Sequence, residues 1–108
     1  MATYLVQARP KRNRLADLEK LLVQQAFRDL RPFGKALTAG LQDARIGTDG
    51  LAFWEEEDYC SPPLAMERAA VLDTYFEEIQ VEAVKPGDGW RRIRDLPPLF
   101  PALPPAPD

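Results

Sequence analysis

The sequence contains no histidine and a single cysteine, Cys60. Without histidine, the chain cannot use Ser-His-Asp or Cys-His catalysis and cannot bind a metal through imidazole. It also lacks the side chain that most often acts as a base near pH 7. One cysteine cannot form a disulfide within the chain, so the sequence does not indicate an oxidising compartment. The commonest forms of nucleophilic catalysis are therefore excluded.

Long hydrophobic runs and an excess of positive charge are also absent. No stretch approaches the roughly 18 apolar residues that a membrane-spanning helix needs. The short apolar run near the N-terminus lies before the basic residues at 9–14, which is the reverse of a secretory signal. A net charge of -3 argues against nucleic-acid binding, which needs a concentrated basic surface. We therefore expect a soluble cytoplasmic protein that binds neither nucleic acid nor membrane.

Several segments have the pattern of β-strands. Residues 3–9 and 51–59 alternate between two faces and are rich in β-formers, and residues 81–84 form a short final strand. The turn at 48–50 contains a glycine and predicts a hairpin that ends in the strand at 51–59. Its first arm is then residues 35–46, for which a helix is the alternative. Gly40 within this segment indicates a bulge or a close approach of another backbone.

Two segments have the apolar spacing of helices lying on a sheet. The first extends from Asn13, a suitable N-cap, to about Leu30, because the residue before Pro32 is forced out of the helical region. The second begins with Ser61 as N-cap and Pro62 in the first helical position, and continues to residue 79. The apolar positions are Leu15, Leu18, Leu22 and Ala26 in the first helix, and Ala65, Ala69, Leu72, Phe76 and Ile79 in the second.

The resulting order, β-α-β-β-α-β, predicts a ferredoxin-like α+β domain over residues 1–89 with both helices on one face of an antiparallel sheet. The other face is then bare, and it carries Leu5 together with Phe53 or Trp54. A second copy of the chain is its simplest partner, so we expect a homodimer. Residues 90–108 form a Pro-rich C-terminal extension. We expect Trp90 to Phe100 to dock on the domain or on a second subunit, and the last residues to be flexible.

The segment Gly34-Lys35-Ala36-Leu37-Thr38-Ala39-Gly40 resembles the opening of the second strand in YciI-like proteins, which belong to the dimeric α+β barrel superfamily. This resemblance implies a dimer in which two ferredoxin-like sheets pack face to face. Many YciI-like proteins carry a histidine–aspartate pair, whereas this chain has no histidine. The resemblance therefore identifies no catalytic residue.

The densest acid cluster is Glu55-Glu56-Glu57-Asp58, directly before Cys60. On a strand, Glu55 and Glu57 project from one face, where they could act as an acid and a base or bind a hard cation. The alternative is a charged strand end that pairs with arginines and faces water, which we favour. Cys60 precedes a predicted helix N-terminus and could be a reactive thiol, although the adjacent carboxylates oppose thiolate formation. We expect no metal and no cofactor.

Ligand binding is the other chemistry that the strands suggest. Aromatic residues could line an apolar cavity and arginines could neutralise an anionic ligand within it. The alternative is that the aromatic residues belong to the core. The candidate ligand-binding residues are Trp54, Phe53, Tyr4, Arg9 and Arg45.

Three functions fit these features. The first is a homodimer that binds a small molecule or serves a structural role without catalysis. The second is a small enzyme acting on an organic acid or aromatic compound, with Glu55, Glu57, Tyr59 and Cys60 as candidate catalytic residues. The third is a protein-interaction module that uses the Pro-rich C-terminal segment. The absence of histidine and of a nucleophile–base motif favours the first.

Overall fold

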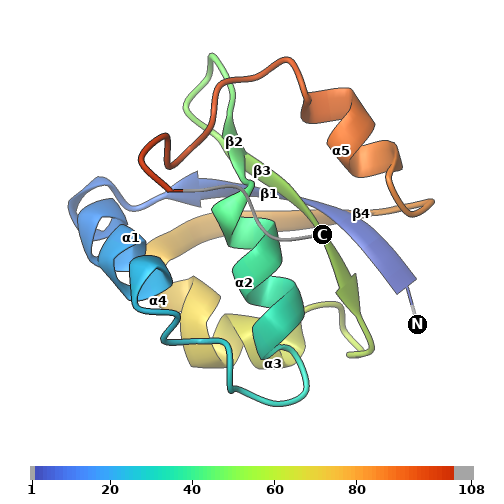
Figure 1. Ribbon diagram of the computed structural model, residues 1–108. Helices are drawn as coiled ribbons and strands as arrows, with labels where there is room; N and C mark the ends of the chain where they lie inside the picture. The colour runs from blue at the N-terminus through green and yellow to red at the C-terminus, as the bar shows by residue number, and fades with distance from the viewer. Residues whose placement is uncertain (1, 104–108) are drawn as a thin grey trace.

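A four-stranded antiparallel sheet organises the structure, a computed structural model that describes residues 2–103 (Figure 1). The strands lie in the order β2-β3-β1-β4, so that β1 and β3 are central and β2 and β4 are the edges. The predicted α+β class with an antiparallel sheet is therefore confirmed. The bounds are Ala2–Pro10 for β1, Arg45–Ile46 for β2, Ala52–Asp58 for β3 and Phe76–Val84 for β4.

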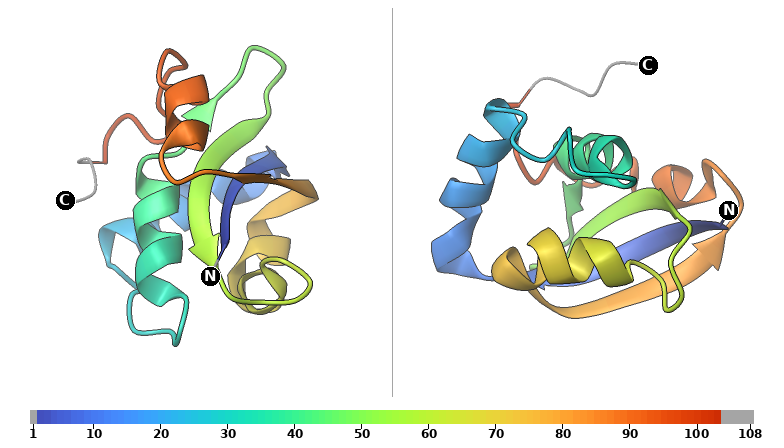
Figure 2. Two further views of the ribbon diagram at one scale, coloured as in Figure 1. Left: turned by 90° about the vertical axis from the view of Figure 1, so that its right-hand side faces the viewer. Right: turned by 90° about the horizontal axis from the view of Figure 1, so that it is seen from below.

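The helices lie on both sides of this sheet. Helices α1 to α4 lie on one side of β1 and β4, whereas α5 lies on the other side, as Figure 1 and the left view of Figure 2 show. Within residues 2–103, no helix is long and apolar enough to cross a membrane. The bounds are Arg12–Arg14 for the 3-10 turn η1, Leu15–Val23 for α1, Gly34–Gln42 for α2, Ala65–Glu67 for α3, Arg68–Leu72 for the π-helical turn η2, Asp73–Tyr75 for α4 and Asp88–Ile93 for α5.

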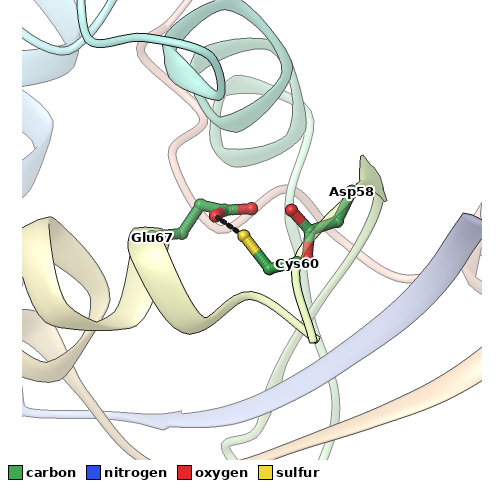
Figure 3. Close-up of side chains that lie close together, drawn as sticks. All are labelled: Asp58, Cys60 and Glu67. Atoms are coloured by element: carbon green, nitrogen blue, oxygen red, sulfur yellow. Dashed lines mark hydrogen bonds between the residues drawn. The ribbon is translucent and has the colours of Figure 1, made fainter. Parts of the chain in front are cut away.

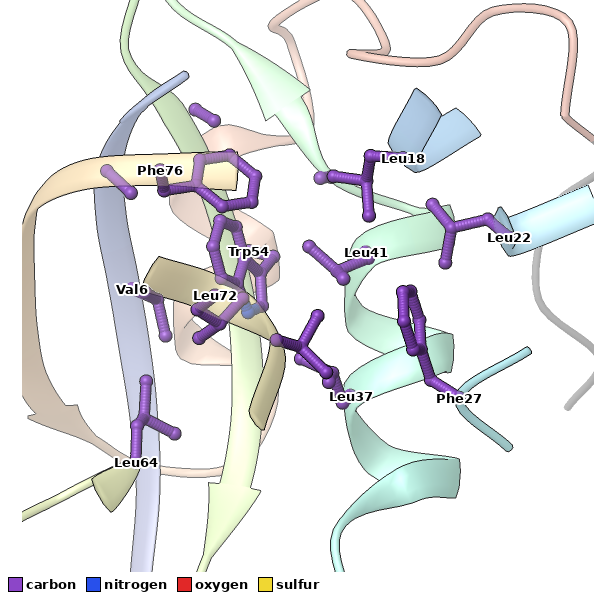
Figure 4. Close-up of a cluster of buried hydrophobic side chains, with 14 of the residues drawn as sticks. Val6, Leu18, Leu22, Phe27, Leu37, Leu41, Trp54, Leu64, Leu72 and Phe76 are labelled. Atoms are coloured by element: carbon purple, nitrogen blue, oxygen red, sulfur yellow. The ribbon is translucent and has the colours of Figure 1, made fainter. Parts of the chain in front are cut away.

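The core fills the space between the sheet and α1, α2 and the continuous helical segment α3–η2–α4 (Figure 4). Trp54 of β3 is its centre: the side chain is fully buried and its rings lie 5.2 Å from the ring of Phe76. Gly40 lets α2 approach this indole, because a Cβ at that position would lie only 2.9 Å from Trp54 Cδ1. Other fully buried side chains include Val6, Leu18, Leu22, Leu37, Leu41, Leu64 and Leu72.

The strands β1 and β3 follow the predicted alternation. In their antiparallel register Val6 lies opposite Trp54 and Ala8 opposite Ala52, and all four side chains are buried under the helices. The intervening residues of β3, including Glu55, project from the opposite face.

The prediction of a strand over residues 35–46 is wrong for most of that segment. Residues 34–42 form α2, and only Arg45–Ile46 pair with β3 as β2. The physical reason lies in the spacing of Leu37 and Leu41, which are four residues apart and both fully buried, so one helical face covers Trp54. The glycine that indicated a strand bulge instead provides a close contact within a helix.

The second predicted helix is displaced at both ends. It begins at Ala65 rather than after Ser61, because Leu64 adopts a left-handed conformation (φ 62°) and its N–H binds Asp58. It ends at Tyr75, and Phe76 starts the nine-residue strand β4. The helical spacing of Phe76 misled the prediction, because β4 pairs with β1 from Pro10 back to Thr3 and that ladder determines its conformation.

The first helix is also shorter than predicted. α1 ends at Val23 instead of near Leu30, and the chain leaves the helix through Gln25, whose φ is 55°. Its inward residues Leu18 and Leu22 are buried as expected.

The sheet face that was expected to be bare is partly covered by the C-terminal segment. α5 packs on this face, and Arg92 forms an ion pair with Glu82 of β4. The chain then follows the edge of β2, where Ile46 N–H donates to the Pro97 carbonyl oxygen at 2.9 Å. Phe100 joins the core at 3% exposure. The flexible tail expected at the very end of the chain falls mainly on residues 104–108, which lie outside the described residues.

Candidate functional site

Three carboxyl side chains are buried together where β3 leads into α3. Glu56 and Asp58 lie on the helix-facing side of β3, at 2% and 5% exposure, and Glu67 of α3 is fully buried. Cys60, in the loop between them, is half-buried. Figure 3 shows the Glu67 carboxyl group pointing toward Cys60 and Asp58. We call Glu56, Asp58, Cys60 and Glu67 the acid–thiol cluster.

Only part of the hydrogen-bonding capacity of this cluster is used. Trp54 Nε1–H donates to Glu56 Oε1 at 3.0 Å, and Leu64 N–H donates to Asp58 Oδ2 at 2.6 Å. The Cys60 thiol donates to Glu67 Oε1 over a long 3.8 Å contact. The second oxygens, Oε2 of Glu56 and Oε2 of Glu67, are buried without a hydrogen-bond donor. Such atoms are rare in native proteins, because an unpartnered buried acceptor is costly.

The environment separates the acidities of the three carboxyl groups. Burial, reinforced by the interaction with Glu67, raises the pKa of Glu56 to about 9. Burial also raises the pKa of Glu67, aided by Asp58. The pKa of Asp58 is lowered: burial alone would raise it, but the Leu64 N–H and the neighbouring Glu67 and Cys60 stabilise the carboxylate more strongly. At neutral pH, Glu56 is therefore protonated and Asp58 ionised.

Cys60 is not an activated nucleophile in this environment. The Met66 backbone tends to lower the pKa of the thiol, but burial and the Asp58 carboxylate outweigh it, so the pKa of Cys60 is raised. The thiolate that a reactive cysteine needs is therefore disfavoured, as the adjacent carboxylates had indicated.

The acid–thiol cluster contains the atoms for a cation site. One ligand atom each from Asp58, Cys60 and Glu67 lies within 4.8 Å of the other two. No lysine or arginine in the described part of the chain forms an ion pair with any member of the cluster. Its negative charge must then be compensated by protons or by a bound cation.

The remaining candidate catalytic residues are not brought together. Glu55 binds the N-terminal end of α5, accepting N–H groups from Gly87 at 2.9 Å and Gly89 at 2.9 Å. Glu57 is exposed on the same face, and Tyr59 is 72% exposed. Only Cys60 lies in the acid–thiol cluster.

The candidate ligand-binding residues are also dispersed. Trp54 and Phe53 project from opposite faces of β3, so they cannot line one cavity. Tyr4 is half-buried against the core beneath the helices. Arg45 Nη1 donates to the Leu96 carbonyl oxygen at 2.8 Å and so holds the C-terminal segment.

Arg45 lines a small hollow of about 130 Å³ beside the C-terminal segment, and Arg9 lines a larger one. Arg9 contributes to a groove of about 600 Å³ at the end of β1, together with Lys11 and Arg12. Asp49 and Glu77 also line this groove, so cations exceed anions by one, three against two. Arg9 pairs with Glu78, whose hydrogen bond and charge raise the pKa of the guanidinium further. We call this hollow the basic groove.

Sequence reasoning named Glu55 and Glu57 on one face of β3 and did not name Glu67, whereas the buried carboxyl groups are Glu56, Asp58 and Glu67. The alternation itself was correct, and it placed Glu56 and Asp58 on the same face as Trp54. That tryptophan should have marked the buried side. A signal for Glu67 also existed, because it lies four residues before Val71 and three after Leu64, both of which are buried.

Comparison of the chain with known protein families, with curated proteins and with solved structures found no match.

Proposed function

We propose that this protein is a non-catalytic binding domain that takes a small organic acid in the basic groove. The groove carries the proposal: it is an open hollow at the end of β1 with room for a small molecule, and three basic side chains line it. Glu55 and Glu57 lie on the face of β3 opposite to the acid–thiol cluster, and the pKa of the Cys60 thiol is raised, so the candidate catalytic residues support binding over catalysis.

Arg12 is the basic residue of the groove that is best placed to bind an anion. Arg9 is held by Glu78, and Lys11 Nζ donates to the Asp73 carbonyl oxygen at 2.8 Å. Arg12 is exposed and has no ion pair within the described residues, so its guanidinium can bind a carboxylate with two parallel hydrogen bonds. Lys11, which forms no ion pair within the described residues, then adds long-range attraction.

Thermal denaturation in the presence of citrate tests this proposal. Citrate should raise the melting temperature in a saturable way at constant ionic strength, because a ligand that binds only the folded state stabilises it. The Arg12→Ala variant should require roughly tenfold more citrate, as loss of a charged hydrogen-bonding group costs about 1.5 kcal/mol or more.

Arg14→Ala is the matched control, because Arg14 is an exposed arginine of the same turn that does not line the groove. Its citrate response should equal that of the unmodified protein. Equal losses in both variants would show that citrate responds only to net charge, and an unsaturable response would contradict a binding site.

We further propose that the domain is ferredoxin-like and related to the dimeric α+β barrels. The strand order β2-β3-β1-β4 and the all-antiparallel pairing support this assignment. The departures are the short β2, the helix α2 before it, and α5 on the face through which such sheets pack.

Self-association is proposed along β4. The C-terminal segment covers the other edge, through the bridge between Arg45 and Pro98, whereas β4 is a nine-residue edge with Val81 at 37% exposure. An open edge of this length is a template for pairing with a second copy.

Light scattering at micromolar concentration should give twice the 12.2 kDa chain mass. Val81→Lys should shift this mass toward the monomer, and a monomeric unmodified protein would contradict the proposal.

A further inference from the structure

The acid–thiol cluster has a surplus of ligand atoms and, among the residues that the structure describes, no counter-charge. It contains three carboxyl groups and a thiol, and within residues 2–103 the donors to its carboxyl oxygens from outside the cluster are Trp54 Nε1–H and Leu64 N–H. Acidic clusters on a surface are held by water, but Glu56 and Glu67 are at least 98% buried and each has an oxygen without a donor. A group in that position either keeps a proton or faces a cation.

The spacing of the ligand atoms is suitable for a small divalent ion. Zinc bonds of about 2.3 Å to sulfur and about 2.0 Å to oxygen, in a tetrahedron, place the two ligand atoms about 3.5 Å apart. The distance from Cys60 Sγ to Glu67 Oε1 is 3.8 Å, and the third ligand atom, from Asp58, lies within 4.8 Å of both. Closing the set around an ion therefore requires side-chain adjustments of about 1 Å or less.

The donor set selects the metal. Calcium and magnesium prefer oxygen ligands alone and usually require more of them. A thiolate with two carboxylates suits a borderline ion, and zinc accepts sulfur and carboxylate oxygen together. Three protein ligands would leave one position of a tetrahedron open, and the half-buried Cys60 gives the ion a route from solvent.

We propose that Asp58, Cys60 and Glu67 bind one zinc ion and that Glu56 positions Glu67 behind it. The Cys60 proton leaves to the buffer as the sulfur–zinc bond forms, so no oxidant or reductant is needed. Trp54 Nε1–H fixes Glu56, and Glu56 lies against the Glu67 carboxyl group, an arrangement typical of the residues that orient metal ligands. The site shares no residue with the basic groove, so either can fail without the other.

Cobalt(II) and zinc(II) binding to tag-free protein test the site. The chain has no histidine, so without a tag no imidazole competes for the metal. One equivalent of cobalt(II) should produce a near-ultraviolet sulfur-to-cobalt charge-transfer band, and zinc should displace it. Cys60→Ser should abolish the band, and Glu67→Gln should weaken zinc binding at least tenfold by calorimetry.

Glu57→Gln is the matched control, because it removes an exposed carboxylate from the same strand and should leave zinc affinity unchanged. Circular dichroism of each variant distinguishes loss of the site from loss of the fold. Glu56→Gln keeps the shape of the side chain and is a milder change, which should weaken zinc binding about threefold. A cobalt complex without the charge-transfer band, or zinc affinity equal in Cys60→Ser and the unmodified protein, would overturn the proposal. Binding of calcium in preference to zinc would also overturn it.

Discussion

The two faces of β3 treat their carboxylates in opposite ways. On the helix-covered face, Glu56 and Asp58 are buried beside a third carboxyl group, and burial raises the pKa of Glu56 to about 9. On the other face, Glu55 is half-buried and satisfied by backbone N–H groups, and Glu57 is exposed. Four consecutive acids thus differ because alternate residues of a strand enter different surroundings. Their environment, more than their residue type, decides whether they are candidates for chemistry.

The largest expected effect concerns the buried face and its dependence on pH. The folded protein keeps the Glu56 proton up to a pKa of about 9, whereas the ordinary value is 4.5. Between these values the folded state binds more protons than the unfolded chain, so the free energy of unfolding should fall as pH rises. One proton gives a slope of at most about 1.4 kcal/mol per pH unit, or roughly 2 kcal/mol between pH 7 and 9.

Urea denaturation at several pH values, with EDTA present, measures this slope. Glu56→Gln carries no titrating proton at that position, so its free energy of unfolding should depend less on pH. Above pH 8 the variant should therefore become more stable relative to the unmodified protein than it is at neutral pH. Asp58 acts in the opposite direction: its lowered pKa contributes stability above the ordinary value of 3.8, and that contribution is lost as pH falls through the folded pKa. If the stability of the unmodified protein were flat between pH 6 and 9, the protonated state of Glu56 would be refuted.

Only part of this contrast between the two faces of β3 could be predicted from the sequence. The alternation of β3 was readable, because period-2 patterning is a property of the strand alone. Which face is buried depends on what packs against it, and α2 was predicted as a strand, so the cover over Trp54 was missing from the prediction. Phe76 fits a helical stripe equally well, and only its pairing with β1 makes it a strand residue. Predicting that Glu67 is buried required knowing where the helix that contains it begins and which side of it faces the sheet.

An intermediate effect is expected on the opposite face, where Glu55 holds α5. Its carboxylate accepts the N–H groups of Gly87, Gly89 and Trp90. Gly89 permits this approach, because a Cβ there would lie 3.0 Å from Glu55 Oε1. Glu55→Ala should therefore lower the free energy of unfolding by about 1–2 kcal/mol, as for loss of a charged acceptor at a helix start.

Hydrogen exchange distinguishes a local from a global effect of this substitution. Amide protection should fall most at Gly89 and Trp90, since α5 loses its attachment to the sheet. Glu57→Ala, the neighbour two residues along the same face, should change stability by no more than about 0.5 kcal/mol. Equal effects of the two substitutions would contradict the conclusion that Glu55 attaches α5 whereas Glu57 is only solvated.

The smallest effect is expected where α5 meets β4 through side chains alone. Arg92 Nη1 lies 2.7 Å from Glu82 Oε2, but both side chains are more than half exposed, so water and salt screen the pair. A double-mutant cycle with Arg92→Ala and Glu82→Ala should give a coupling free energy of about 0.2–1 kcal/mol, decreasing in 1 M salt. The Glu55 contacts should be less sensitive to salt, because they are half-buried and made to backbone N–H groups of fixed geometry. A coupling of Arg92 with Glu82 larger than the loss in Glu55→Ala would mean that the exposed ion pair, and not the carboxylate beneath α5, attaches this helix to the sheet.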